Sequence, residues 1–369
     1  MPQPPFSAPF LWPLAAAASV AETTAALFKQ LATWAADDQS SARLPEPAWA
    51  MPNEVVLELP ALRLRDFSRQ ARGRATLVCA PYALHGATIA DFAPGHSIVE
   101  ALLHNGLTRV LVTDWRSATP AMRFFSIDTY LSDLNVAVDE LDPPVDLVGL
   151  CQGAWMALLY AARFPKKVRQ VAMVGGPIDL NAGQSRLSQL VANLPLSTFE
   201  ELVREGEGRV LGHRVLEFWG SAIGGDDVGR VLQLASRMAA DGRGELEERF
   251  RQWYAWTVDL PGTYYLQVVQ QLFKENQIAE GRFVALGRQL DLAELRIPML
   301  LLAGTQDELI SMDQLFATAR LVGTAEPDIE TMTEPCDHLG LFLGAKTLAR
   351  SWPRIAQWLS AERAIQKAS

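Results

Sequence analysis

Short apolar runs alternate with helical patterns along most of the chain. Five of these runs have the length and composition of buried strands, and they span Ala75–Ala80, Arg109–Thr113, Val145–Leu150, Val168–Val174 and Pro298–Ala303. Helical patterns separate them, for example at Ser97–His104, which precedes the second run. Strands that alternate with helices are typical of a mostly parallel sheet. The pattern therefore predicts an α/β fold.

A long helical stretch separates the fourth predicted strand from the fifth. It spans Asp179–Arg296, over a hundred residues, and Glu245–Val258 is a clear example of its helical periodicity. Its aromatic residues include Trp219, Trp253, Trp256, Tyr254, Tyr264, Tyr265, Phe273 and Phe283. A loop of this length is unusual in a compact domain, so we expect a helical insertion. A lid over the site and a packed subdomain with no gating role are the two alternatives.

These patterns divide the chain into four segments. We expect an N-terminal helical arm at 1–60, the first part of the core at 61–180, the helical lid insertion at 181–295 and the second part of the core at 296–369. The apolar stretch Phe10–Phe28 lacks the basic flank of a secretory signal, and Pro13 and Glu22 interrupt it. We therefore expect no transmembrane segment. An amphipathic helix that docks on the body, or on an apolar particle, is the interpretation that remains.

Charge and cysteine content narrow the class of protein. The formal net charge is −9 and no basic run is present, which argues against a nucleic-acid partner. Three cysteines without a C-x-x-C pair argue against a disulfide framework or a zinc site and favour a reducing cytoplasm. Metalloprotease and nucleotide-binding motifs are absent from the sequence, so we expect no cofactor and no metal.

The segment Gly149–Gly153 has the sequence G-L-C-Q-G and stands directly between a predicted strand and a strong helical pattern. This is the context in which a G-x-nucleophile-x-G turn presents a nucleophile. Cys151 would then lie at a helix N-terminus, whose partial positive charge favours a thiolate. We take Cys151 as the candidate nucleophile.

His338 is the candidate base, because it follows the last strand-like segment and fits the chain order nucleophile, acid, histidine. The other four histidines suit structural roles better: His85, which could line the pocket, His96, His104 and His213. Asp307 is the candidate acid, since it lies in the loop after the fifth predicted strand. Glu308 is the near alternative, and Asp337 is too close to His338 to orient it.

Two backbone N–H groups would stabilise an oxyanion in this arrangement. The N–H of Gln152 directly follows the nucleophile. The second donor comes from the loop after the first predicted strand, where Tyr82 and Ala83 are both candidates. The sequence leaves the choice between them open.

Through these residues the chain resembles the polyhydroxyalkanoate synthases, especially the short-chain-length class that works with a second subunit. The matching segments are G-L-C-Q-G at 149–153, Asp114–Trp115, Ser126–Tyr130, D-H-L-G-L-F at 337–342 and Pro353–Leu359. The resemblance runs from about Ala75 to Leu359 and is weaker in the insertion. It implies an α/β-hydrolase fold with a mostly parallel sheet and a helical lid insertion, and a triad of Cys151, Asp307 and His338.

Some features lean toward intracellular polyhydroxybutyrate depolymerases instead. The segment A-P-Y-A-L-H-G-A-T-I at 80–89 is similar to theirs, and Ala154 stands where the synthase elbow usually has a second glycine. The first hypothesis is a cysteine acyltransferase that builds polyhydroxyalkanoate from a 3-hydroxyacyl-coenzyme A thioester. The second is hydrolysis of intracellular polyester, and the third is a granule-binding protein with little catalysis.

The expected partners follow from these hypotheses. They are a 3-hydroxyacyl-coenzyme A or polyester substrate and, as open alternatives, the surface of a polyester granule, a homodimer partner or a second subunit. The expected localisation is cytoplasmic. The resemblance adds association with polyester granules as an open alternative.

Overall fold

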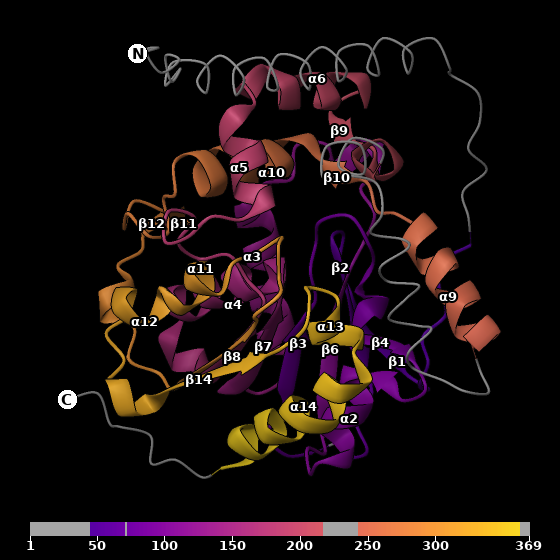
Figure 1. The fold of residues 1–369 in the computed structure, drawn as a ribbon. Coiled ribbons are helices and arrows are strands. Elements are labelled where there is room, and N and C mark those ends of the chain that lie inside the picture. Colours follow the sequence, from indigo (N-terminus) through magenta and orange to yellow (C-terminus); the bar gives the residue numbers. More distant parts are fainter. Residues whose placement is uncertain (1–44, 71, 217–242, 362–369) are drawn as a thin grey trace, which may run out of the picture.

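The computed structural model describes residues 45–70, 72–216 and 243–361. These residues form an eight-stranded sheet, in which the strands lie side by side in the order β1-β2-β6-β3-β7-β8-β13-β14 (Figure 1). Its strands are β1 (Glu54–Glu58), β2 (Leu62–Asp66), β3 (Thr76–Cys79), β6 (Val110–Trp115), β7 (Val145–Leu150), β8 (Val168–Val174), β13 (Met299–Gly304) and β14 (Ile329–Glu334). The pairs from β6 to β14 are parallel, whereas β2 pairs antiparallel with both of its neighbours.

All five predicted strands are present, within one or two residues of their expected ends. The strand β1 lies inside 1–60, the range expected to form a helical arm, so the sheet begins earlier along the chain than the sequence predicts. The predicted helix at Phe10–Phe28 lies outside the described residues.

Helices cover both faces of the sheet and bury it in two cores. Alternate side chains of a strand point to opposite faces. Leu147 of β7 joins a core with residues of α3 and α4, whereas the next residue, Val148, joins a core with residues of α2 and α14. In Figure 1, α2 and α14 pack against each other toward the bottom of the view. The helices of this framework are α2 (Ile98–His104), α3 (Ile127–Asp139), α4 (Gln152–Arg163), α11 (Met312–Phe316), α12 (Thr318–Leu321), α13 (Gly340–Leu343) and α14 (Ala345–Ser360).

The described part of the insertion is mostly helical, as expected, but it also contains short strand pairs. Its helices are α5 (Arg186–Asn193), α6 (Leu196–Glu205), α9 (Arg243–Ala255), α10 (Gly262–Gln267) and a π-helical continuation at Val268–Lys274. Its strand pairs are β9 (Arg209–Val210) with β10 (Leu260–Pro261) and β11 (Val284–Ala285) with β12 (Arg288–Gln289), and a further small pair outside the insertion joins β4 (Asp91–Ala93) to β5 (His96–Ser97). Figure 1 places α5, α6 and α10 above the sheet. Their apolar side chains extend the α3/α4 core, whereas Phe250 and Trp253 of α9 join the other one.

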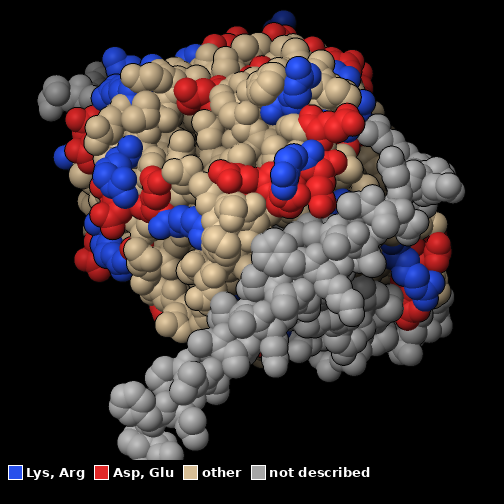
Figure 2. Space-filling model, turned by 90° about the horizontal axis from the view of Figure 1, so that it is seen from above, with Lys and Arg blue, Asp and Glu red and all other residues tan. Residues whose placement is uncertain are grey.

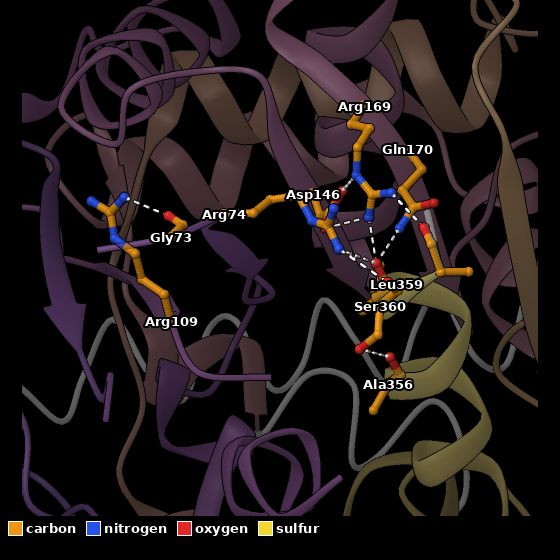
Figure 3. Close-up of polar contacts among 10 residues, drawn as sticks. Gly73, Arg74, Arg109, Asp146, Arg169, Gln170, Ala356, Leu359 and Ser360 are labelled. Carbon is orange, nitrogen blue, oxygen red and sulfur yellow. Dashed lines mark hydrogen bonds and ion pairs between the residues drawn. The ribbon is translucent and has the colours of Figure 1, made fainter. Parts of the chain in front are cut away.

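Two arginines, Arg74 and Arg169, fix the C-terminal end of α14 near the edge of the sheet where β7 begins (Figure 3). Asp146, near the start of β7, binds Arg169 at 2.6 Å and Arg74 at 3.2 Å. Both arginines donate to the carbonyl oxygen of Leu359, at the negative end of the helix dipole. This anchoring lies at the opposite end of β7 from Cys151, so it stabilises the framework and leaves the other end of the strands free for the site.

The surface carries mixed charge on the face that Figure 2 shows. Basic and acidic side chains are interspersed there among larger areas of other residues. In the described ranges, no helix is both long and apolar enough to cross a membrane.

Candidate active site

Cys151 occupies a sharp turn between β7 and α4. Its backbone has φ 51° and ψ −117°, a conformation that non-glycine residues rarely adopt, and its N–H donates to the carbonyl oxygen of Val174 at 2.9 Å. It precedes the first residue of α4, Gln152, and its side chain is partly exposed. The turn therefore presents the sulfur at the N-terminus of a buried helix, where the helix dipole favours negative charge.

Glycines on both sides of Cys151 make this turn possible. A Cβ at Gly153 would lie 1.9 Å from the carbonyl oxygen of Cys79, at the end of β3. A Cβ at Gly149 would lie 2.4 Å from the Cα of Ala154. Both distances are shorter than any tolerable contact, so the strand, the turn and the helix pack this closely only without side chains at these two positions.

His338 and Asp307 form a direct, nearly buried pair. The Nδ1 atom of His338 lies 2.6 Å from Oδ2 of Asp307, whose side chain is only 1% exposed. The other carboxylate oxygen, Oδ1, accepts hydrogen bonds from the N–H groups of Leu309 and Ile310, each at 2.9 Å. The carboxylate is thus held by its own loop in the orientation that the imidazole needs.

The two alternative acids are occupied elsewhere. Glu308 is half exposed and forms an ion pair with Arg186 at 3.0 Å. Asp337 accepts from the N–H of Gly340 at 2.8 Å, a cap of the turn that follows it. Among the three carboxylates, Asp307 is the one that the structure places on His338.

His338 also interacts with Cys151, so its imidazole contacts both the carboxylate of Asp307 and the sulfur of Cys151. Burial alone would lower the pKa of His338, but the charges of Asp307 and Cys151 and hydrogen bonds to both raise it well above its ordinary value. The ring packs edge-on against Phe342, with 5.3 Å between centroids. The imidazole stands between the carboxylate of Asp307 and the sulfur of Cys151, and both interactions favour its protonated form.

The predicted oxyanion donors lie on both sides of the turn. Gln152 opens α4, and the first N–H groups of a helix have no partner within the helix. Tyr82 and Ala83 follow the end of β3, which pairs with β7 so that Cys79 lies opposite Gly149. The loop predicted to carry the second donor therefore starts beside the turn at Cys151.

The other histidines have structural contacts. His85 packs its ring on Trp253, with 4.4 Å between centroids, and burial lowers its pKa to about 4. His96 bonds through Nδ1 to the carbonyl oxygen of Leu343 at 2.9 Å, and His104 is an exposed residue near Glu100. Within the described ranges, no group of three or more His, Cys, Asp or Glu side chains is arranged to hold a metal ion.

One contact of the site was not predicted from the sequence. The hydroxyl of Tyr264, on α10 of the insertion, donates to the carbonyl oxygen of Tyr82 at 3.3 Å. Tyr264 is fully buried and close enough to Cys151 for the cysteine's charge to contribute to raising its pKa, although burial is the largest cause and Tyr130 the next. In the sequence, Tyr264 is one of the eight aromatic residues noted in the insertion, and no local feature distinguishes it from the other seven.

Comparisons with known proteins agree with the fold and the resemblance. Residues 232–363 match the family described as PHB de-polymerase C-terminus. The chain is 25% identical over 350 residues to the poly(3-hydroxyalkanoate) polymerase subunit PhaC of Haloferax mediterranei, which covers 89% of this chain and 68% of that protein. It is 27% identical to PhaC of Synechocystis, with 73% of each chain covered.

Solved structures show the same fold at low identity. An epoxide hydrolase from Bacillus megaterium superposes with a TM-score of 0.52 at 15% identity, over 82% of this chain and 98% of the enzyme. A monoacylglycerol lipase from Paleococcus ferrophilus gives a TM-score of 0.52 at 16% identity, over 81% and 98%. The chain therefore has an α/β-hydrolase fold, contains a segment that matches the PHB de-polymerase C-terminus family, and is similar to the PhaC polymerase subunits.

Proposed function

We propose that this protein is an acyltransferase of the polyhydroxyalkanoate polymerase kind, in which Cys151 forms an acyl-enzyme with a 3-hydroxyacyl group. The observation that carries the proposal is the contact of a buried His338–Asp307 pair with a cysteine at a helix N-terminus. The homology to PhaC subunits supports the substrate class. A cysteine suits this chemistry because the attacking and leaving sulfurs are matched in a thioester exchange.

Acylation begins with the proton on His338, in line with the raised pKa of this imidazole. The Cys151 thiolate attacks the carbonyl carbon of the 3-hydroxyacyl-coenzyme A thioester. The carbon–sulfur bond to coenzyme A then breaks, and the coenzyme leaves as a thiol with the proton from His338. The neutral imidazole that remains keeps its orientation through the hydrogen bond to Asp307.

Chain growth uses the same residues in the reverse order. The hydroxyl of a second 3-hydroxyacyl group attacks the acyl-enzyme while His338 accepts its proton. The new ester forms, the bond to Cys151 breaks, and the sulfur leaves as a thiolate beside the protonated imidazole. The N–H groups of Gln152 and of Tyr82 or Ala83 stabilise the oxyanion of each tetrahedral intermediate.

The insertion 181–295 has a role in this proposal as the cover that keeps water away from the acyl-enzyme. Polymer growth requires the thioester to persist until a hydroxyl group arrives. Its aromatic side chains pack over the loop after β3: the ring of Trp253 packs at a tilt on His85, and Trp256 lies against Gly86. A granule surface and a second subunit are the partners that this activity implies.

Hydrolysis of polyester is the second candidate function. The match of residues 232–363 to the PHB de-polymerase C-terminus family favours it. In this case water, activated by His338, replaces the hydroxyl group in the second step, and a free 3-hydroxy acid is released. The residues and the acyl-enzyme are the same, so the acceptor alone separates the two functions.

One experiment tests the two functions in parallel. The protein is given 3-hydroxybutyryl-coenzyme A or amorphous polyester, and released thiol and released acid are followed over time. We expect thiol release with polymer formation, and no release by Cys151→Ala. Acid release from polyester, without thiol release from the coenzyme A thioester, would contradict the polymerase function and support the depolymerase function. Binding to polyester with neither product would leave the granule-binding hypothesis.

A further inference from the structure

The loop after β3, which carries a candidate oxyanion donor, is held mainly by the insertion. Within 253–264, the N–H of Val258 donates to the carbonyl oxygen of Leu84 at 2.9 Å, and the carbonyl oxygen of Trp256 lies 3.4 Å from Nδ1 of His85. The rings of Trp253 and Tyr254 pack on His85, at 4.4 and 5.1 Å between centroids. The loop is therefore held by a segment that lies far along the sequence, 171 positions away at the contact of His85 with Trp256.

Tyr82 is fixed at both of its ends. Its hydroxyl accepts a hydrogen bond from Tyr130 at 2.8 Å and can donate to the carbonyl oxygens of Arg116 at 3.1 Å or Asp259 at 3.3 Å. Its carbonyl oxygen accepts from the hydroxyl of Tyr264 at 3.3 Å. The three tyrosine rings lie 4.7 to 5.2 Å apart in a buried cluster. The side chain anchors the residue, and Tyr264 sets the direction of its carbonyl group.

That carbonyl group determines the geometry of the neighbouring N–H. The carbonyl of Tyr82 and the N–H of Ala83 belong to one planar peptide unit and point in opposite directions. A hydrogen bond to the oxygen therefore fixes the direction of the N–H, and it also polarises the peptide so that the N–H becomes a stronger donor. Rotation of this peptide would move the donor that the loop offers to an oxyanion.

Tyr264 is itself held in place. Its N–H donates to the carbonyl oxygen of Phe125 at 3.0 Å, and Gly262 at the start of α10 donates to the carbonyl oxygen of Gly208 at 2.9 Å. A Cβ at Gly262 would lie 2.5 Å from that same oxygen, so α10 and the turn before β9 pack as closely as backbone allows. The hydroxyl is thus presented from a rigid support.

We propose that Tyr264 is a positioning residue, whose hydroxyl fixes the Tyr82–Ala83 peptide and with it the oxyanion donor of this loop. The inference rests on the proposed function in one respect, namely that the reaction passes through an oxyanion at an acyl carbon. It adds that the segment 253–264 is a fixed component of the active site, and that any opening of the insertion takes place elsewhere.

The test compares Tyr264→Phe with Tyr265→Phe. The control residue is adjacent and buried, and in the described part of the chain its hydroxyl has no hydrogen-bond partner. Acylation of Cys151 is measured by rapid mixing with 3-hydroxybutyryl-coenzyme A and, separately, with p-nitrophenyl butyrate. Alkylation of Cys151 by iodoacetamide is measured in parallel, because this displacement forms no oxyanion.

We expect Tyr264→Phe to slow acylation about 10- to 100-fold, somewhat less than the loss of a whole oxyanion donor. Its alkylation rate and that of Tyr265→Phe should match the wild type, as should acylation of Tyr265→Phe. Equal acylation of Tyr264→Phe and wild type, or a parallel loss of alkylation, would overturn the inference. If p-nitrophenyl butyrate acylates the wild-type protein and 3-hydroxybutyryl-coenzyme A does not, the proposed function alone is overturned. The reaction with p-nitrophenyl butyrate still tests the role of Tyr264.

Discussion

Gly153 lies against Cys79 so closely that a Cβ on the glycine would stand 1.9 Å from the cysteine's carbonyl oxygen. This contact joins the first turn of α4 to the end of β3. The turn that carries Cys151 and the loop predicted to carry the second oxyanion donor thus share one backbone-to-backbone interface. Under the proposed function, the spacing between the two oxyanion donors would depend on this contact.

Gly153→Ala should therefore disturb the packing of α4 against the end of β3, next to the turn that carries Cys151. Because backbone atoms oppose the new methyl group, the strand or the helix must shift, at a cost of about 1–3 kcal/mol of unfolding free energy or more. Urea unfolding followed by circular dichroism measures this cost. Ala154→Gly is the matched control, since synthases usually carry glycine there, and it should cost no more than about 1 kcal/mol. A Gly153→Ala protein as stable and active as the wild type would contradict the close packing.

The sequence predicted the central strands because their environment is uniform. β7 and β13 are buried at every position, and apart from Asp146 near the start of β7 their residues are apolar or glycine. The strands β1 and β14 lie at the two edges of the sheet. β1 has no buried position, β14 mixes exposed with buried positions, and β2 has arginines at Arg63 and Arg65. Such strands have no long apolar run, and their pairing with neighbours is what defines them.

The same contrast applies to the candidate site. Cys151, His338 and Asp307 were identified because each follows a strand in a fixed chain order, and the structure places Asp307 on His338 at 2.6 Å. Tyr264 was not identified, because its contact with Tyr82 joins residues 182 positions apart. Such a contact depends on how the insertion folds back over the core, and no local pattern encodes this.

The backbone strain at Cys151 leads to a stability prediction. A residue with φ 51° and ψ −117° is strained if it has a Cβ, and alanine keeps that strain whereas glycine removes it. Cys151→Gly should therefore be more stable than Cys151→Ala by about 1 kcal/mol, after the greater freedom of glycine in the unfolded chain is subtracted. Urea unfolding of both inactive variants provides the measurement. If the alanine variant is the more stable of the two, the turn is not strained in solution.

Selective alkylation should separate the three cysteines. Burial raises the pKa of Cys79 to about 12, and burial, with smaller effects from nearby carboxylates, raises the pKa of Cys336 to about 12. Near pH 7.5 both remain thiols, whereas Cys151 stands at a helix N-terminus beside His338. Iodoacetamide should label Cys151 at least about a hundredfold faster, as measured by peptide mass spectrometry. Comparable labelling of Cys336 would contradict an activated thiolate at Cys151.

The pH dependence of acylation should reveal the charge on Asp307. His338 must be protonated to give its proton to the leaving thiol, and its pKa is raised well above the ordinary value of about 6.5. Activity is therefore present below this raised pKa and is lost as the pH rises through it. Burial acts in the opposite direction, so Asp307→Asn, which removes the first of the raising charges, should shift the basic limb of kcat/KM to lower pH.

Glu308→Gln is the control for this shift, because Glu308 is half exposed and its ion pair is with Arg186. Its profile should superpose on that of the wild type, and its rate at pH 7 should stay within about twofold of the wild-type rate because the lost interaction is a surface ion pair. Asp307→Asn should lose roughly a hundredfold or more, since the histidine then lacks both its orientation and the charge that stabilises its cation. The two variants differ by one position in the loop, so the comparison isolates the carboxylate that contacts His338. A basic limb that moves in Glu308→Gln and stays fixed in Asp307→Asn would transfer the acid role to the neighbouring residue.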